Sequence, residues 1–286
     1  MSEKERGKIY VIGTPIGNLS DITIRALETL KKVDIVVAED TRRTLKLLSY
    51  YQIRKPLISY HKFNERKRAV ELLRMLKSGR NIGVVSDAGM PGISDPGKEL
   101  ISKAWDAGID VVVIPGVSAV TAALSISGFE TTPFAFFGFP PSKGKDRRRF
   151  FEKLSGEELT IVIFESPKRF RKTLRDLQKH LGNRHILVAR ELTKIHEEIF
   201  RGSLEEAIDK WLGPVKGEIT MIIEGKKKSL DESSDLKSAL IHIREELNKL
   251  ICSGMSTRDA VKEISIKYSL PRSDVYKEAV KIDRER

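Results

Sequence analysis

The chain has 286 residues, 40% of them hydrophobic and 32% charged, which is typical of a globular protein long enough for two domains. It contains no run of 18 apolar residues and begins with a polar stretch over 1–8, so we expect no membrane span, no signal peptide and a cytoplasmic location. Cys252 is the only cysteine, which excludes an internal disulfide and a cysteine metal cluster, and the five histidines form no metal-binding motif.

The net charge is +12, and most of the excess lies in one fifth of the chain. Residues 138–194 contain 15 Lys and Arg against 7 Asp and Glu, a local excess of +8. Clustered positive charge favours a polyanionic partner, with nucleic acid first, although a basic solubilising surface would give the same count.

Strands and helices alternate in the first part of the chain. Apolar runs predict strands at 8–13, 34–38, 56–60, 82–85 and 111–114. Helical spacing of apolar residues predicts helices at 19–33, 42–51, 64–77, 95–107 and 117–126. This alternation predicts a mostly parallel α/β domain over 1–128.

A second α/β domain follows over 129–226, in which strands and helices do not alternate one by one. We expect strands at 133–138, 159–164, 185–189, 198–201 and 218–224, with helices at 167–181 and 204–212. A polar linker begins at 226, and helical patterns at 236–251, 256–268 and 271–282 predict a small helical domain within 227–286.

The stretch 83–97 carries the strongest local signal for a ligand. A buried strand runs into a loop rich in glycine and proline, where the backbone can approach a ligand closely. Asp95 and Pro96 have the residue types of a helix cap and a first helical position. Ligands bind at such strand ends in open α/β sheets, although an ordinary surface turn would have the same kind of sequence.

Other strand ends carry small or polar residues, at 115–119, 164–167 and 190–192, which suggests one ligand in a cleft between the two domains. Residues 13–17 lack the dinucleotide fingerprint. Residues 138–146 resemble a phosphate-binding P-loop but have one residue too many and an Asp at the magnesium position. We therefore expect a mobile loop there whose cations contact phosphates.

Four segments together resemble a known family: 13–23, 39–42, 86–97 and 189–194. Collinear over 9–225, they are similar to the RsmI-type small-subunit rRNA methyltransferases of the tetrapyrrole-methylase superfamily. The resemblance implies two α/β domains with S-adenosylmethionine between them and a homodimer. It also implies methylation of the ribose 2′-oxygen of a cytidine in the decoding region of small-subunit (16S) rRNA, with the rRNA or the ribosomal subunit as partner.

The resemblance also implies site residues, and the chemistry adds others. The cofactor would contact Gly89, Met90, Pro91, Ile93, Ser94, Ser118, Ala119, Phe164, Glu165, Leu192 and Thr220. A ribose hydroxyl needs a general base or a stabilising cation, for which the candidates are Asp40, Glu191 and Lys194. RNA phosphates would contact Arg42, Lys143, Lys145, Arg147, Arg148 and Arg149. Methyl transfer by displacement requires no metal.

Two alternatives remain open from the sequence. A methylase of the same fold acting on a tetrapyrrole or other small molecule would need a roomy apolar cleft and no basic loop. A non-catalytic RNA-binding factor in ribosome assembly would bind RNA with no cofactor affinity, so cofactor binding separates it from an enzyme.

Overall fold

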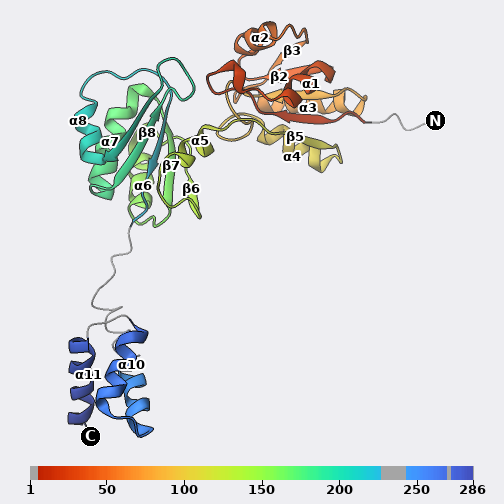
Figure 1. Cartoon of the computed structure of the whole chain (residues 1–286). Helices are drawn as coiled ribbons and strands as arrows, with labels where there is room; N and C mark the ends of the chain where they lie inside the picture. Colours follow the sequence, from red (N-terminus) through yellow and green to blue (C-terminus); the bar gives the residue numbers. More distant parts are fainter. Residues whose placement is uncertain (1–5, 227–242, 269–271, 286) are drawn as a thin grey trace. The chain divides into compact units, whose positions relative to one another are not determined.

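A computed structural model describes residues 6–226, 243–268 and 272–285 (Figure 1). The chain divides into two compact units, Met1–Lys226 and Lys227–Arg286. The first unit contains two five-stranded sheets, and the described part of the second consists of helices. No helix among these described residues is long and apolar enough to cross a membrane.

The first sheet is entirely parallel and has the strand order β3-β2-β4-β1-β5. Its strands are β1 (Ile9–Ile12), β2 (Ile35–Ala38), β3 (Leu57–Ser59), β4 (Ile82–Val85) and β5 (Val111–Ile114). The helices that follow these strands are α1 (Ile24–Lys32), α2 (Thr41–Tyr50), α3 (Glu65–Lys77), α4 (Lys98–Asp106) and α5 (Ala119–Ser125). A short 3-10 helix, η1, spans Leu19–Asp21.

Alternate residues of these strands fill two cores, as the two-residue period of a strand requires. Val37 and Val84 pack with α3 and α4 on one face of the sheet. Val36 and Val85 pack with α1 and α2 on the other face. The sheet is therefore covered on both sides, and its strand ends remain for a ligand.

The second sheet is mixed and has the order β6-β7-β10-β8-β9, in which only β6 and β7 run parallel. Its strands are β6 (Phe134–Phe136), β7 (Thr160–Glu165), β8 (His185–Arg190), β9 (Glu198–Ser203) and β10 (Ile219–Ile223). The helices α6 (Gly144–Ser155), α7 (Pro167–Leu181) and α8 (Leu204–Lys210) cover one face of it.

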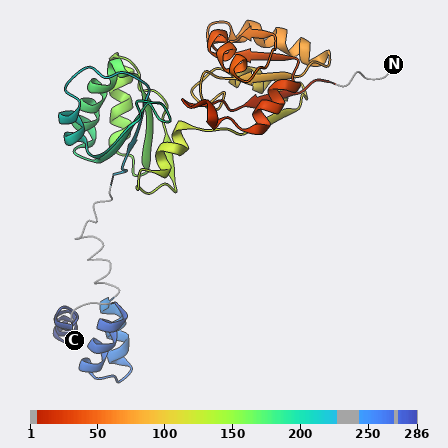
Figure 2. The same ribbon diagram turned by 45° about the horizontal axis from the view of Figure 1, so that its top comes forward.

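The other face of the second sheet is covered by α5, a helix that follows the last strand of the first sheet (Figures 1 and 2). Its residues Val120, Ala123 and Leu124 pack with Val162 of β7 and Ile222 of β10. The division of this unit into two domains at 128/129 stays a prediction. Helix α5 precedes that boundary, yet its apolar side packs against the second sheet, which follows the boundary.

Two local expectations are corrected by the structure. Residues 143–149, expected as a mobile loop, lie mostly in α6, because Arg147, Phe151 and Leu154 repeat at helical spacing and face the core. The helix expected from Asp95 begins at Lys98 instead, and its N-cap residue is Gly97 with φ of 141°. The side chain of Asp95 is therefore not used as a cap.

The second unit contains a helix over 243–252, α10 (Thr257–Lys267) and α11 (Arg272–Glu285). Leu247, Ile264 and Ala279 are among the residues of its own small core. The parts of the expected helices at 236–242 and 271 lie outside the described residues.

Candidate active site

A cavity of about 480 Å³ lies where loops after β2, β4 and β5 meet the ends of β7 and β10, and we call it the inter-sheet pocket. All but two of the residues expected at the cofactor line it: Gly89, Met90, Ile93, Ser94, Ser118, Ala119, Phe164, Glu165 and Thr220. The other two lie elsewhere: Pro91 is buried, and Leu192 packs against the core that includes α5.

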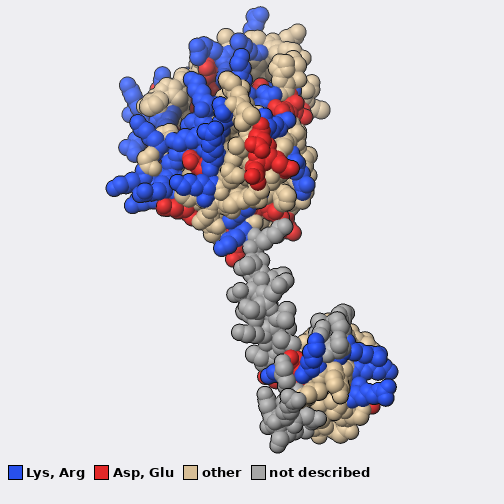
Figure 3. Space-filling view, turned by 90° about the vertical axis from the view of Figure 1, so that its left-hand side faces the viewer, with Lys and Arg blue, Asp and Glu red and all other residues tan. Residues whose placement is uncertain are grey.

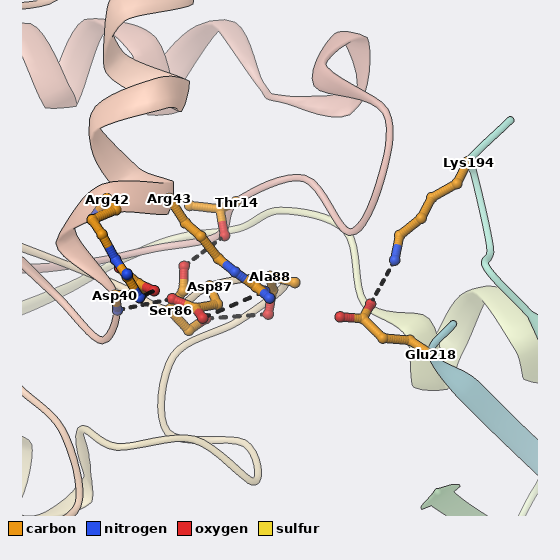
Figure 4. A network of polar contacts seen from close by, with 9 residues as sticks. All are labelled: Thr14, Asp40, Arg42, Arg43, Ser86, Asp87, Ala88, Lys194 and Glu218. Carbon is orange, nitrogen blue, oxygen red and sulfur yellow. Dashed lines mark hydrogen bonds and ion pairs between the residues drawn. The ribbon is translucent and has the colours of Figure 1, made fainter. Parts of the chain in front are cut away.

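Backbone contacts hold the loops of this pocket together. Thr14 and Gly89 exchange backbone hydrogen bonds of 2.9 and 3.0 Å, and the Thr14 hydroxyl donates to the Ser86 carbonyl at 3.2 Å (Figure 4). Gly89 has φ of 77°, which glycine adopts readily. Added at Gly13, a Cβ atom would lie only 2.7 Å from the Gly116 Cα. The glycines therefore allow three strand-end loops to pack backbone against backbone.

Acidic side chains form one side of the inter-sheet pocket, and sequence analysis did not assign them to it. Glu39, Asp87, Asp95 and Glu218 all line it. Burial, followed by the charge of Glu39, raises the pKa of Asp95 to about 7. Burial and the charge of Asp87 also raise the pKa of Glu39. Carboxyl groups held this close favour a positively charged ligand, because such a ligand relieves their mutual repulsion.

A second cavity of about 450 Å³ adjoins the first, and we call it the α2 pocket because α2 supplies five of its lining residues. The two cavities share the residues Ile16, Arg43, Asp87, Ala88 and Glu218. The wall between them therefore carries two carboxylates and a guanidinium.

Figure 4 shows how these charged groups lie. The Arg43 guanidinium lies 3.5 Å from the carboxylate of Asp87. Arg43 belongs to α2, and Asp87 belongs to the loop after β4. Lys194 and Glu218 pair at 2.9 Å and come from the second sheet's side. Sequence analysis did not select Arg43, although Arg43, Lys46, Leu47 and Tyr50 recur at helical spacing and so share one face of the helix predicted there.

Asp40 is the N-cap of α2. Its Oδ1 accepts from the Arg42 backbone N–H at 2.9 Å, and its Oδ2 pairs with the Arg42 guanidinium at 2.9 Å. These hydrogen bonds from Arg42 lower the pKa of Asp40 to about 2. Neither pocket includes Asp40 or Arg42, and a carboxylate with such a low pKa is a poor base.

Glu191 and Lys194 form an ion-paired corner on the second sheet's side. Lys194 Nζ donates to Glu191 Oε1 at 2.7 Å, and that oxygen also accepts from the Glu218 backbone N–H at 2.8 Å. Burial lowers the pKa of Lys194, but the hydrogen bonds to Glu191 and Glu218 outweigh it, and the net shift is upward. Lys194 is therefore a fixed cation in the α2 pocket and not a base.

Comparison with known proteins gives these pockets a family. Residues 8–208 match the sequence profile of the Tetrapyrrole (Corrin/Porphyrin) Methylases, which is more than half of the chain. The chain belongs to the tetrapyrrole methylase family. The methyltransferase CobJ, a solved structure, aligns with a TM-score of 0.59 at 19% identity over 77% of this chain and 95% of that one, which supports the fold alone.

Two relatives of this tetrapyrrole methylase are much more similar in sequence, and both are named Ribosomal RNA small subunit methyltransferase I. The one from Thermotoga maritima is 51% identical over 77% of this chain and 100% of its own length. The one from Synechocystis is 44% identical over 97% of this chain and 99% of its own length. The match thus covers both units of the chain.

Tetrapyrrole methylases take their methyl group from S-adenosylmethionine, and the inter-sheet pocket fits that cofactor. Met90, Ile93 and Phe164 offer apolar contacts for its methionine chain and adenine. The carboxylates of Asp87 and Glu218 offer partners for its positive charge. The volume of the inter-sheet pocket, about 480 Å³, falls within the roughly 300–1,000 Å³ usual for ligand pockets. Among the described residues, no group of three or more His, Cys, Asp or Glu could hold a metal ion.

The cations expected at RNA divide into exposed and buried ones in this tetrapyrrole methylase. Lys143, Lys145, Arg148 and Arg149 are exposed at the start of α6. Arg147 is only 4% exposed and binds Asp176, Thr173 and the Pro141 carbonyl, so it holds α6 to α7 and is not available to RNA. This corrects the expectation for Arg147.

Helix α7 extends the basic surface in a way that sequence analysis did not predict. Its exposed cations recur one turn apart on one face: Lys168, Lys172, Arg175 and Lys179. Figure 3 shows Lys and Arg side chains gathered over one side of the first unit. The spacing of four, three and four residues within a predicted helix was the available signal.

Proposed function

We propose that this chain transfers a methyl group from S-adenosylmethionine to the ribose 2′-oxygen of a cytidine in the decoding region of small-subunit rRNA. The observation that carries the proposal is the extensive identity to relatives named as methyltransferases of that RNA. A cation-lined pocket that shares a wall with the cofactor pocket supports it, because an RNA acceptor is a polyanion.

The residues of the shared wall supply what the reaction needs. When bound, S-adenosylmethionine supplies a methyl group on a positively charged sulfur, which passes to the ribose oxygen as that oxygen loses its proton. Asp87 and Glu218 line both pockets, so either carboxylate is placed to accept this proton. The Lys194 ammonium lines the α2 pocket and stabilises the negative charge that develops on the oxygen.

Further parts of the proposal concern assembly and place. The division into 1–128, 129–226 and 227–286 gives two domains that enclose the cofactor and a helical domain that adds an RNA contact. We expect a homodimer, which light scattering of the purified protein tests. A substrate in the small ribosomal subunit means action in the cytoplasm.

The test uses small subunits isolated from cells that lack this protein, incubated with the protein and labelled S-adenosylmethionine. The expected product contains one labelled ribose, and the RNA chain resists alkaline cleavage at that nucleotide, since cleavage requires a free 2′-hydroxyl. Label in a base, or no label in RNA despite binding of S-adenosylmethionine, would contradict the proposal.

A further inference from the structure

The floor of the α2 pocket is one face of a single helix. Arg43, Lys46, Leu47 and Tyr50 of α2 line the pocket and follow one another at intervals of three, one and three residues. Thr44 also borders the pocket but is itself buried, and Leu48 is buried in the core of the first sheet. The face of α2 toward the pocket is therefore basic at one end and aromatic at the other.

Two cations at the basic end lie one turn apart and have donors to spare. Arg43 is 60% exposed and touches Asp87 through a single contact of 3.5 Å, although a guanidinium carries five N–H donors. The side chain of Lys46 is exposed, and its ammonium makes no hydrogen bond or ion pair with any residue of the described ranges. A pair of cations at this spacing suits one phosphate group.

Tyr50 stands at the aromatic end of this face. The residue is 64% exposed and borders both the α2 pocket and a third cavity beside the 191–196 loop. It packs edge-on against Tyr51 with ring centroids 4.9 Å apart. The Tyr51 hydroxyl donates to the Leu19 carbonyl at 2.5 Å, which fixes the ring that supports Tyr50. An exposed, supported aromatic ring is a stacking platform for an unpaired base.

These features lie beside the wall shared with the cofactor pocket. Whatever occupies the α2 pocket meets Asp87 and Glu218, which also line the inter-sheet pocket. A nucleotide with its phosphate at the basic end and its base at Tyr50 would therefore have its ribose between the two, close to the shared wall. A nucleotide inside a duplex cannot enter such a pocket, so the acceptor must leave its stack.

We propose that the α2 pocket receives a single nucleotide turned out of its RNA strand, with Arg43 and Lys46 on its phosphate and Tyr50 against its base. This inference rests on the proposed function, since it names how that site takes its acceptor. The pocket thereby selects an unstacked, single-stranded nucleotide, and the exposed cations of α6 and α7 hold RNA beyond it.

The experiment compares Tyr50→Ala, Tyr50→Phe and Lys46→Ala with two controls. Trp105→Ala removes an aromatic residue that is 62% exposed on α4 and borders none of the cavities described. Lys32→Ala removes an exposed lysine at the end of α1. Lys32 comes just before β2, so it lies near the amino ends of the strands, whereas the pockets lie at their carboxyl ends. Each variant is assayed for methylation of isolated small subunits and for S-adenosylmethionine affinity by calorimetry.

We expect Tyr50→Ala and Lys46→Ala to raise the KM for small subunits roughly 10- to 100-fold, with cofactor affinity unchanged. Tyr50→Phe keeps the stacking ring and should raise the KM less than Tyr50→Ala does, whereas both controls should resemble wild type. An unchanged KM in Tyr50→Ala, or an equal rise in the controls, would overturn the inference.

A second measurement separates this inference from the proposed function. Binding of cytidine 5′-monophosphate is followed by NMR with the protein saturated in S-adenosylhomocysteine, so no methylation is required. We expect binding in wild type and in the controls and its loss in Tyr50→Ala and Lys46→Ala. No nucleotide binding in wild type overturns the inference, whereas nucleotide binding without methylation of RNA overturns the proposed function alone.

Discussion

Replacing Arg147 by alanine should destabilise the first unit, whereas the same change at its neighbour Arg148 should not. The side chain of Arg147 is 5% exposed and lies 2.7 Å from the carboxylate of Asp176, 2.9 Å from the hydroxyl of Thr173 and 3.0 Å from the Pro141 carbonyl. Its removal leaves a half-buried carboxylate without its cation and a carbonyl without that donor. Arg148 is 68% exposed, and its ion pair spans 3.6 Å.

The magnitude follows from the burial of the pair. Removing one partner of a buried ion pair costs about 3–5 kcal/mol, and because Asp176 is 27% exposed we expect the lower end, about 3 kcal/mol. In a unit of this size each kcal/mol lowers Tm by about 2–4 °C, which gives a fall of about 6–12 °C. Arg148→Ala should change stability by no more than about 0.5 kcal/mol.

Thermal unfolding followed by tryptophan fluorescence measures this difference. Both tryptophans, Trp105 and Trp211, belong to the first unit, so the signal reports its unfolding without the helical unit. A Tm for Arg147→Ala within about 2 °C of that for Arg148→Ala would refute the assignment of Arg147 to the α6–α7 contact.

Three further outcomes are expected. Burial raises the pKa of Asp95 to about 7 in the folded protein, from 3.8 in the unfolded chain. The bound proton therefore stabilises the folded state at low pH, and this contribution to stability is lost as the pH rises through about 7. Asp95→Asn should therefore raise Tm at about pH 8 more than at about pH 5, and equal effects at both would contradict this. Gly116→Ala should abolish S-adenosylmethionine binding in calorimetry, because its Cβ would lie 2.8 Å from the backbone of the loop after β1, whereas Gly156→Ala meets nothing within 4 Å and should bind normally. Lys143→Ala combined with Arg148→Ala should weaken RNA binding and reduce its salt slope by about 2 with cofactor affinity unchanged; RNA binding equal to wild type would exclude these cations from the interface.

Regular elements with local signals could be predicted from the sequence. The strands over 82–85 and 111–114 have the expected bounds, because each is a short apolar run that ends at a loop. Helix α7 spans 167–181 as expected, since proline starts it and Gly182 follows its end. The family and its fold were also predicted, from motifs that carry the strand-end loops.

Features decided by tertiary contacts could not be predicted in the same way. Helix α6 was not predicted, because Arg147 occupies a core-facing position where an apolar residue is expected. Its partners Thr173 and Asp176 lie in α7, 26 and 29 residues further along the chain, so the local sequence does not show that this arginine is buried. Asp95 and Pro96 have the residue types that start a helix, yet the left-handed backbone of Gly97 delays the start. Adjacent residues on a helix point about 100° apart, so Arg43 faces the pockets while Arg42 remains beside its cap.

The position of α5 has a consequence for synthesis of the protein. Its side chains Val120, Ala123 and Leu124 emerge from the ribosome before β7, β8 and β10, whose residues bury them. The nascent chain therefore carries an apolar helix without its packing partners while about a hundred further residues, up to Ile223, are added. Arrest of translation between α5 and β10 should leave this helix open to chaperones, and completion of the second sheet then buries its apolar side.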